Sequence, residues 1–378
     1  MRLNRVFHFV AVSILAGSFC EVRGQSVETE GWGRLKGGEE VALITLRHGP
    51  IAAEIATHGA QIVSLQVPDK DGKSTNVVLG YPDLKSAERG GTLGAVIGRY
   101  ANRISKGGFE IDGERFDLES VNPKTGIQLH GGKTGFQFQN WEIEENPERV
   151  GFEPHPAAVT LRLVSPDGHE GFPGNLTVWV QYRIAPDSGP AARTRAWLHE
   201  PVATFEMEFR ARTDAPTHVN LTNHAYFNLA GEGTIAGHSI LWGAGEVLEF
   251  DANRVPTGKV LPLESMGLRS GSTTALKPGS ADFQPFDHCF VTPDNGNFGA
   301  LVGGNGLKMS VETSQPGVQI YTANHFNGDP FPRYGGICFE TQHFPDTPNQ
   351  PAFPTTLLRP GEWLMETTTL RFSVEVAL

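Results

Sequence analysis

Short runs in which hydrophobic and polar residues alternate recur along the chain, and they predict strands rather than helices. A period of two is typical of a strand with one buried face. Clusters of turn-forming residues, such as the Pro-Asp-Lys-Asp-Gly at 68–72, follow several of these runs. No long stretch has the periodicity of an amphipathic helix. The predicted strands are 41–46, 51–55, 61–67, 109–111, 159–164, 176–184, 205–210, 307–312 and 372–376.

The composition fits a fold made of strands and tight turns. The chain has 45 glycines and 26 prolines in 378 residues, and both residue types punctuate turns. Many short strands joined in this way are typical of a sandwich or a barrel. We find no linker and no internal repeat, and therefore predict one domain over residues 25–378, with a recognisable core at 31–378. Residues 187–200 and 263–285 lack strand patterning and are predicted to be surface loops.

The first 24 residues predict a secretory signal peptide. Arg2 and Arg5 precede the mostly apolar stretch 6–19, and small residues lie near a plausible cleavage point before Gln25. The apolar stretch is too short to span a bilayer. We therefore expect an exported protein, periplasmic or extracellular, whose mature chain is not held in a membrane.

The charge balance narrows the class of partner. The formal net charge is −11, and the predicted leader carries three arginines against one glutamate, so the mature chain is more acidic still. An acidic protein is a poor ligand for nucleic acid or for an anionic membrane. A neutral small molecule is compatible with this charge, and we expect a monomer or a weak dimer.

Cysteine usage indicates no disulfide framework. Removal of Cys20 with the leader leaves Cys289 and Cys338, and a chain of this length has a core large enough to need no covalent staple. We favour two buried free thiols, with a single disulfide as the alternative. Neither cysteine has a histidine pair at zinc-ligand spacing, so we predict no metal site.

The segment 223–229, Asn-His-Ala-Tyr-Phe-Asn-Leu, carries the most informative candidate chemistry. His224 lies among amides and aromatic rings, with almost no free charge in the segment. An imidazole in such surroundings can exchange a proton with a polyhydroxylated ligand. Tyr226 follows two residues later and is a second candidate.

Two earlier segments offer hydrogen-bonding groups. Asn102 and Arg103 are adjacent, and a planar guanidinium beside an amide suits vicinal hydroxyls. His130 precedes two glycines, which we expect to allow close approach of the backbone to a ligand. Taken alone, Arg103 pairing with a carboxylate and His130 occupying a turn are the simpler explanations. The turn-rich loop 165–174 is a candidate wall of the site, with its acids in solvent.

Residues on predicted strands complete the candidate set. Asp287 begins a strand, where a cap or turn role is the commoner explanation. Gln319 and Tyr321 share one face of a strand because they are two residues apart. Glu340 ends an apolar run, where a carboxylate is either desolvated and functional or paired with an arginine.

Together these segments resemble the motifs of the aldose 1-epimerase (mutarotase) family. The matches follow the family's order and cover roughly residues 40–375, which makes them far more specific than any single motif. The resemblance implies an all-β fold, a large antiparallel β-sandwich with few short helices and a sugar groove across its strands. The matching segments are 98–109, 129–132, 167–174, 216–229, 286–288, 315–322, 338–342, 345–354 and 358–362.

The same resemblance implies roles for individual residues. His224 matches the general acid, Glu340 the general base, and His130 a supporting acid. No cofactor and no metal is implied, and the expected substrate is a free hexose of the galactose or glucose type. The residues implied to bind this sugar are Asn102, Arg103, Tyr226, Asp287 and Gln319.

Interconversion of α and β anomers requires a proton to leave the C1 hydroxyl while another reaches the ring oxygen. Free glutamate and histidine side chains have pKa values of about 4.3 and about 6.5. We therefore expect modest tuning to keep Glu340 ionised and His224 protonated near neutral pH.

Three rival functions stay open on the sequence alone. A hydrolase or lyase of the same fold acting on a larger sugar would usually need two carboxylates, and Asp287 with Glu340 qualifies nominally. An epimerase of hexose phosphates would need a basic phosphate site, whereas the candidate set contains one arginine. A non-catalytic sugar-binding module would lack His224 or Glu340. Residues 187–200 and 263–285 depart from the family pattern, so the preferred sugar stays open.

Overall fold

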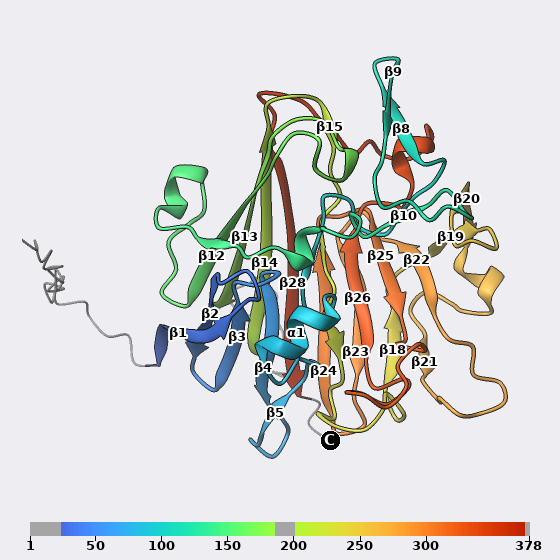
Figure 1. Cartoon of the computed structure of the whole chain (residues 1–378). Coiled ribbons are helices and arrows are strands. Elements are labelled where there is room, and N and C mark those ends of the chain that lie inside the picture. Colours follow the sequence, from blue (N-terminus) through green and yellow to red (C-terminus); the bar gives the residue numbers. More distant parts are fainter. Residues whose placement is uncertain (1–23, 186–200, 375–378) are drawn as a thin grey trace, which may run out of the picture.

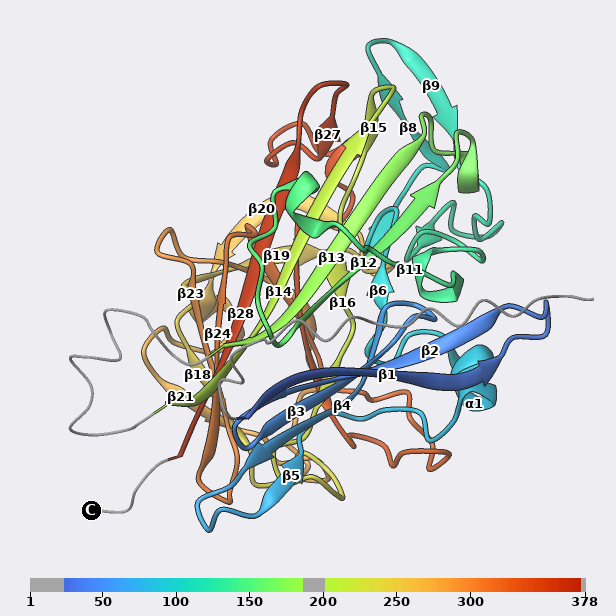
Figure 2. The same cartoon turned by 90° about the vertical axis from the view of Figure 1, so that its left-hand side faces the viewer.

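Three antiparallel sheets of five, nine and six strands form the body of the computed structural model, which describes residues 24–185 and 201–374 (Figures 1 and 2). The five-stranded sheet is a meander in chain order, which suits strands joined by tight turns. Its strands are β1 (Gln25–Arg34), β2 (Glu40–His48), β3 (Ile51–Ala56), β4 (Gln61–Pro68) and β5 (Ser74–Asn76).

The nine-stranded sheet is the largest, and its inner face is mostly apolar. Val178, Val180 and Tyr182 alternate with outward-facing residues and are buried. Figure 2 shows its long strands crossing the five-stranded sheet at a large angle. In spatial order it comprises β11 (Glu142–Ile143), β12 (Ala158–Ser165), β13 (Leu176–Ala185), β14 (Pro201–Thr213), β28 (Leu364–Val374), β24 (Leu307–Thr313), β23 (Asn297–Val302), β18 (Ser239–Trp242) and β21 (Thr273–Ala275).

The six-stranded sheet has one face against the core and one face free for a site. Phe290 and Phe339 point into the core, where they contact Trp242 and Phe298 of the nine-stranded sheet with ring centroids 4.8 and 6.2 Å apart. Successive side chains of a strand point to opposite faces, so the neighbours of these rings lie on the other side. In spatial order the sheet comprises β17 (Tyr226–Phe227), β26 (Ile337–Gln342), β25 (Gly317–Tyr321), β22 (Asp287–Val291), β19 (Glu246–Phe250) and β20 (Pro256–Pro262).

Short elements connect and cover these sheets. The hairpin of β8 and β9 projects from the body in both views (Figures 1 and 2). The two-stranded pairs are β6 (Val96–Ile97) with β16 (Thr222–Asn223), β7 (Arg103–Ile104) with β10 (Gln128–Leu129), β8 (Gly108–Ile111) with β9 (Glu114–Asp117), and β15 (Thr217–His218) with β27 (Leu357–Leu358). The 3₁₀ turns are Phe136–Phe138, Pro147–Val150, His169–Gly171, Leu263–Met266 and Thr347–Asn349.

Helix α1 (Leu84–Gly90) is the single α-helix of the described residues. The Asp83 side chain accepts a hydrogen bond from the Ser86 backbone N–H at 2.7 Å, which satisfies one of the free donors of the first turn. Leu84 and Ala87 bury one side of the helix. None of the helices within residues 24–185 and 201–374 is long and apolar enough to cross a membrane.

The predicted all-β sandwich is confirmed, and each predicted strand overlaps an observed one, the last of them over residues 372–374. One loop prediction is partly wrong: residues 273–275 form an edge strand because their backbone pairs with β18. The predicted leader lies almost wholly outside the described residues, and the loop predicted at 187–200 lies entirely outside them. Export and the single-domain organisation therefore stay predictions.

Candidate active site

The free face of the six-stranded sheet gathers the polar residues of four strands. Gln319 lies directly opposite Glu340, and Tyr321 lies opposite both Asp287 and Cys338. Directly paired residues of antiparallel strands share a face, so these side chains form one polar surface. Tyr226 extends it onto β17, where it pairs with Cys338.

Glu340 lies at the centre of this surface and is almost completely buried, with 2% of its area exposed. Its Oε2 atom has no hydrogen-bond partner among the described residues. A buried carboxylate oxygen without a donor is unfavourable, so this atom is positioned to accept a hydrogen bond from a ligand. Burial and, to a smaller extent, Asp287 raise the pKa of Glu340 to about 8, while Arg103 opposes the change.

His224 faces Glu340 from the connection between β16 and β17. Its Nε2 lies 3.6 Å from Glu340 Oε2. Its backbone is held on both sides, because its N–H donates to Ala95 at 2.9 Å and its carbonyl accepts from Gly94 at 3.0 Å. The ring stacks on Tyr226 at 5.0 Å. Burial lowers the pKa of His224 to about 4.

The protonation states expected from the sequence for Glu340 and His224 are wrong. A pKa of about 8 for Glu340 and about 4 for His224 leaves both groups neutral at pH 7. Burial disfavours the charged form of each group, so it raises the pKa of the carboxyl group and lowers the pKa of the imidazole. The pair therefore carries one proton over the interval between these values, and that proton resides on Glu340 before a ligand binds.

Asn102 and His130 hold each other in place. The His130 N–H donates to the Asn102 carbonyl at 2.8 Å, and the Asn102 N–H donates to His130 Nδ1 at 3.2 Å. Because Nδ1 is an acceptor here, the neutral ring carries its proton on Nε2. Both residues have left-handed backbones, with φ of 63° and 51°. The His130 and His224 rings are 5.3 Å apart.

The two glycines after His130 serve the protein's own packing, which corrects the prediction that they admit a ligand. A Cβ on Gly131 would lie 2.0 Å from the Gly98 carbonyl oxygen, and one on Gly132 would lie 2.2 Å from the Glu170 carboxylate. The prediction that the acids of 165–174 are solvated is also wrong for Glu170. It is buried because it accepts hydrogen bonds from the N–H and hydroxyl of Thr134.

Arg103, Asp287 and Gln319 form the polar end of the site. Gln319 Nε2 donates to Asp287 Oδ1 at 2.7 Å, while Arg254 Nε lies 3.8 Å from Asp287 Oδ2. Arg103 Nη1 donates to Asn102 Oδ1 at 3.1 Å. Its remaining guanidinium donors are available to a ligand, because the described residues contain no ion pair to Arg103.

All eight residues proposed from the sequence line one cavity of about 280 Å³. Four further lining residues were not proposed as site residues. Tyr321 shares the strand face of Gln319, and Leu129 ends the short strand β10 directly before His130. Thr92 and His325 lie in irregular segments that have no comparable pattern. The complete lining is Thr92, Asn102, Arg103, Leu129, His130, His224, Tyr226, Asp287, Gln319, Tyr321, His325 and Glu340.

Three of these side chains have the spacing of a metal site. His130, His224 and Glu340 each present a ligand atom, and these atoms lie within 4.8 Å of one another. Two imidazoles and a carboxylate are ligands suited to Zn²⁺. However, the Asn102 N–H fixes the His130 proton on Nε2, so that nitrogen is a donor rather than a ligand. The absence of a metal from the reaction stays a prediction.

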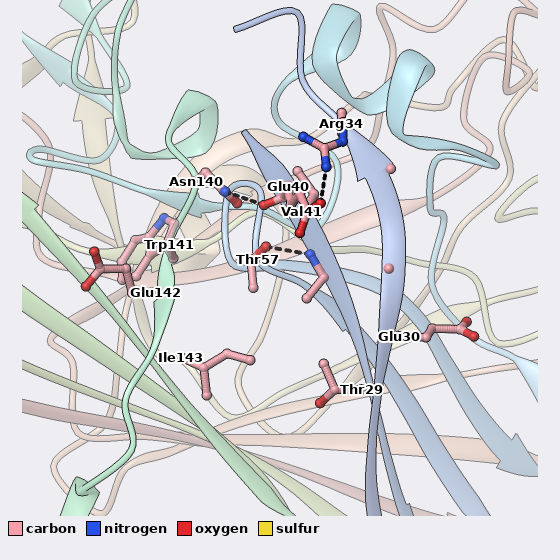
Figure 3. Close-up of a pocket in the computed structure, with 13 residues that line it drawn as sticks. Thr29, Glu30, Arg34, Glu40, Val41, Thr57, Asn140, Trp141, Glu142 and Ile143 are labelled. Carbon is pink, nitrogen blue, oxygen red and sulfur yellow. Dashed lines mark hydrogen bonds and ion pairs between the residues drawn. The ribbon is translucent and has the colours of Figure 1, made fainter. Parts of the chain in front are cut away.

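A larger cavity lies away from this chemistry, between β1, β2 and β11 (Figure 3). Its polar groups are already used by the protein. Arg34 pairs with Glu40, and Asn140 Nδ2 donates to the Glu40 carbonyl at 2.8 Å. Thr57 accepts the Ala42 N–H at 3.0 Å. None of the residues proposed from the sequence lines this cavity, so we place the active site on the six-stranded sheet.

The two cysteines near the site are free and buried, as favoured from the sequence. Cys338 Sγ lies 3.5 Å from His224 Nδ1, on the side of the ring opposite Glu340. Burial raises the pKa of both thiols, so they are protonated and unreactive at neutral pH. Cys338 therefore supports the imidazole by packing and by a weak hydrogen bond.

Comparison with known proteins agrees with this geometry. Residues 42–371 match the family model described as aldose 1-epimerase. The chain belongs to the aldose 1-epimerase family. A galactose mutarotase from Mus musculus is 38% identical over 354 residues, covering 89% of this chain and 96% of the relative. An aldose 1-epimerase from Escherichia coli K12 is 32% identical over 362 residues, covering 89% and 97%.

A solved structure of an aldose epimerase homologue from C. elegans has the same fold. It is 25% identical, covers 86% of this chain and 96% of its own, and superposes with a TM-score of 0.73. The family, the fold and the epimerase class of enzyme predicted from the sequence are thereby confirmed. The role of each site residue is a separate matter and depends on the geometry above.

Proposed function

We propose that the cavity interconverts the α and β anomers of a free hexose by acid–base opening and closure of the pyranose ring. One observation carries this assignment: the unpartnered Glu340 Oε2 faces His224 Nε2 at 3.6 Å in the cavity that the candidate residues line. Two adjacent oxygens of a hexose, O1 and O5, need proton exchange in this reaction. A carboxylate and an imidazole at this spacing can each address one of them.

The sugar is held in our proposal by the polar end of the cavity. Arg103 and Asp287 bind the hydroxyls on the far side of the ring from O5, with Asn102 and Gln319 orienting them. The His130 Nε2 proton, fixed by the Asn102 N–H, supports the ring oxygen. Tyr226 holds the His224 ring by stacking on it.

Ring opening proceeds from the ionised form of the pair. Glu340 takes the proton of O1–H, the C1–O5 bond breaks as the C1=O1 bond forms, and His224 delivers its proton to O5. The open aldehyde turns about the C1–C2 bond. Closure then uses a protonated Glu340 and a neutral His224, which is the form that burial favours in the empty cavity. One shared proton therefore serves both directions, and each group contributes about 10²–10⁴-fold.

Ligand binding favours the ionised form needed for opening. The O1–H group donates to the orphan Oε2 of Glu340, and a hydrogen bond to the charged form lowers the pKa of a carboxylate. The nearby Arg103 acts in the same direction. The proton then moves from Glu340 to His224 across a short separation.

The rival functions fit the structure less well. A hydrolase needs a second free carboxylate, whereas Asp287 is already bonded to Gln319 and lies beside Arg254. A hexose phosphate needs a basic cluster, whereas Arg103 is the one lysine or arginine lining the cavity. A non-catalytic module would have no reason to keep a desolvated carboxylate 3.6 Å from a histidine.

Polarimetry tests the proposal directly. Freshly dissolved α-D-galactose and α-D-glucose are followed with wild-type protein, Glu340→Gln and His224→Ala. We expect the wild type to accelerate the approach to anomeric equilibrium and each variant to lose most of that acceleration. A Glu340→Gln variant as active as the wild type would show that another group is the base.

A further inference from the structure

A second cavity adjoins the active site and has no role in the reaction described above. It has a volume of about 390 Å³, compared with about 280 Å³ for the reacting cavity. Thr92 and His325 line both, so the two spaces share a wall. If the smaller cavity holds one hexose ring, the larger one has room for another.

The lining of this second cavity combines free polar groups with an aromatic ring. Among the described residues, the side chains of Arg89 and Asp329 have no hydrogen-bond or ion-pair partner. Asn327 Oδ1 accepts the Asp329 N–H at 3.3 Å, which leaves its Nδ2 donors free. Phe326 supplies an apolar platform, held by Tyr226 and His325 at ring distances of 4.9 and 4.7 Å.

The mixed charge of the cavity selects the kind of ligand. A guanidinium, a carboxylate and an amide can together donate to and accept from the hydroxyls of a neutral sugar. The Asp329 carboxylate in the same space would repel a phosphate. The chemistry therefore favours a glycosyl group over a phosphoryl group.

The position of the cavity selects the carbon that carries this group. Across the six-stranded sheet, Asp287 on β22 is followed by Gln319 on β25, Glu340 on β26 and Tyr226 on β17. The His224 ring stacks on Tyr226 at 5.0 Å, and Tyr226 contacts Phe326 of the second cavity at 4.9 Å. The order along the site is thus Asp287, then Glu340, then His224 with Tyr226, then Phe326 and the second cavity. With O1 at Glu340 and O5 at His224, the ring continues past O5 to C5 and its C6 arm. C6 therefore points toward the second cavity.

We propose that this cavity is a subsite for a second sugar linked to O6 of the reacting hexose, so that the enzyme also acts on the reducing end of 1→6-linked disaccharides. The proposal rests on the function assigned above, because that function orients the ring. Arg89, Asn327 and Asp329 bind the hydroxyls of the second ring, and Phe326 packs against its apolar face. No bond to the second sugar is made or broken.

Polarimetry with paired substrates tests the subsite. The initial rates for freshly dissolved single anomers of glucose, of melibiose (1→6-linked) and of maltose (1→4-linked) give kcat/KM for the wild type, Arg89→Ala and Ser86→Trp. Arg89 and Ser86 line the second cavity and not the first. Arg333→Ala is the matched control. Arg333 lies on the same loop as Asn327 and Asp329, but it packs over Tyr334 outside both cavities.

We expect Arg89→Ala to lower kcat/KM for melibiose about tenfold, the size of one charge-assisted hydrogen bond. Ser86→Trp, which fills the cavity, should lower it further. Glucose and maltose should change less than about twofold, and Arg333→Ala should change none of the three.

Three results would overturn the proposal. They are wild-type turnover of glucose without turnover of melibiose, equal losses on glucose and melibiose in Arg89→Ala, or a loss confined to maltose. Glucose 6-phosphate as a fourth substrate identifies a phosphate site if Arg89→Ala impairs that sugar alone, which also contradicts the proposal. If the wild type turns over no monosaccharide at all, the proposed function itself fails. This outcome is distinct from all the results above, in which the wild type acts on at least one sugar.

Discussion

The six-stranded and nine-stranded sheets follow the same alternation of side chains, yet they treat their carboxylates in opposite ways. On the nine-stranded sheet the inner positions are mostly apolar, and its carboxylates have cationic or imidazole partners. Glu206 lies on the outer face, paired with Arg183, and the buried Glu366 lies 2.5 Å through Oε1 from His343 Nε2. On the six-stranded sheet Glu340 is buried with an unpartnered oxygen. The first arrangement serves stability. The second makes binding and proton transfer possible at the expense of stability.

The contrast predicts that catalysis depends on Glu340 and His224 as a unit. Glu340→Gln and His224→Ala should each lower kcat by about 10²–10⁴-fold. The double variant should lose little more than the worse single variant, because one proton passes through both groups. Polarimetric rates of the wild type, the two single variants and the double variant form a double-mutant cycle. Multiplicative losses would indicate that the two groups act independently.

Placing a carboxylate at the matching inner position of the nine-stranded sheet should be strongly destabilising. Val180 is fully buried on β13 between Leu161 and Phe209. Val180→Glu should lower the free energy of unfolding by about 3 kcal/mol or more, since no ligand or cation offsets its desolvation. Urea unfolding measures the loss, with Val180→Leu as the control for shape. A loss below about 1 kcal/mol would show that this core admits water.

Removing the buried carboxyl group from the site should stabilise the protein increasingly as pH rises. Glu340 keeps its proton up to about pH 8 when folded but loses it near 4.5 when unfolded. The folded state thus binds more protons in this interval, so the contribution of Glu340 to the free energy of unfolding falls as pH rises through it. In the wild type this contribution falls by up to about 1.4 kcal/mol per pH unit. Glu340→Gln abolishes the fall, because glutamine does not titrate. Thermal unfolding from about pH 5 to about pH 8 should show a widening gap in Tm between variant and wild type, whereas a constant gap would contradict the raised pKa.

The smallest effect should come from the surface carboxylate. Glu206 pairs with Arg183, and both side chains retain access to solvent. Glu206→Gln should change the free energy of unfolding by less than about 1 kcal/mol and leave the rate of anomer exchange unchanged. The same unfolding and polarimetric assays apply. A marked loss of activity would mean that the two sheets are coupled more closely than their packing indicates.

The sequence was sufficient for the strands and for the eight residues that meet in the cavity, because both depend on local patterns. Alternation marked the strands, and polar residues inside apolar runs marked Gln319 and Glu340. What it lacked was the degree of burial around each group. For that reason Glu340 and His224 were expected to be charged although burial favours the neutral form of both, and Glu170 was wrongly placed in solvent. His325 and Thr92 come from irregular segments, whose positions depend on tertiary packing rather than on any local pattern.

The pH dependence of kcat/KM for anomer exchange by the wild type tests the central claim, that Glu340 and His224 share one proton. The claim predicts a bell-shaped profile with a plateau between limbs near pH 4 and pH 8. Below about pH 4 His224 is protonated as well as Glu340, so the pair carries two protons. Above about pH 8 Glu340 loses its proton, so the pair carries none. Limbs near the ordinary values for free glutamate and histidine, about 4.3 and about 6.5, would contradict it, because the rate would then fall across neutral pH.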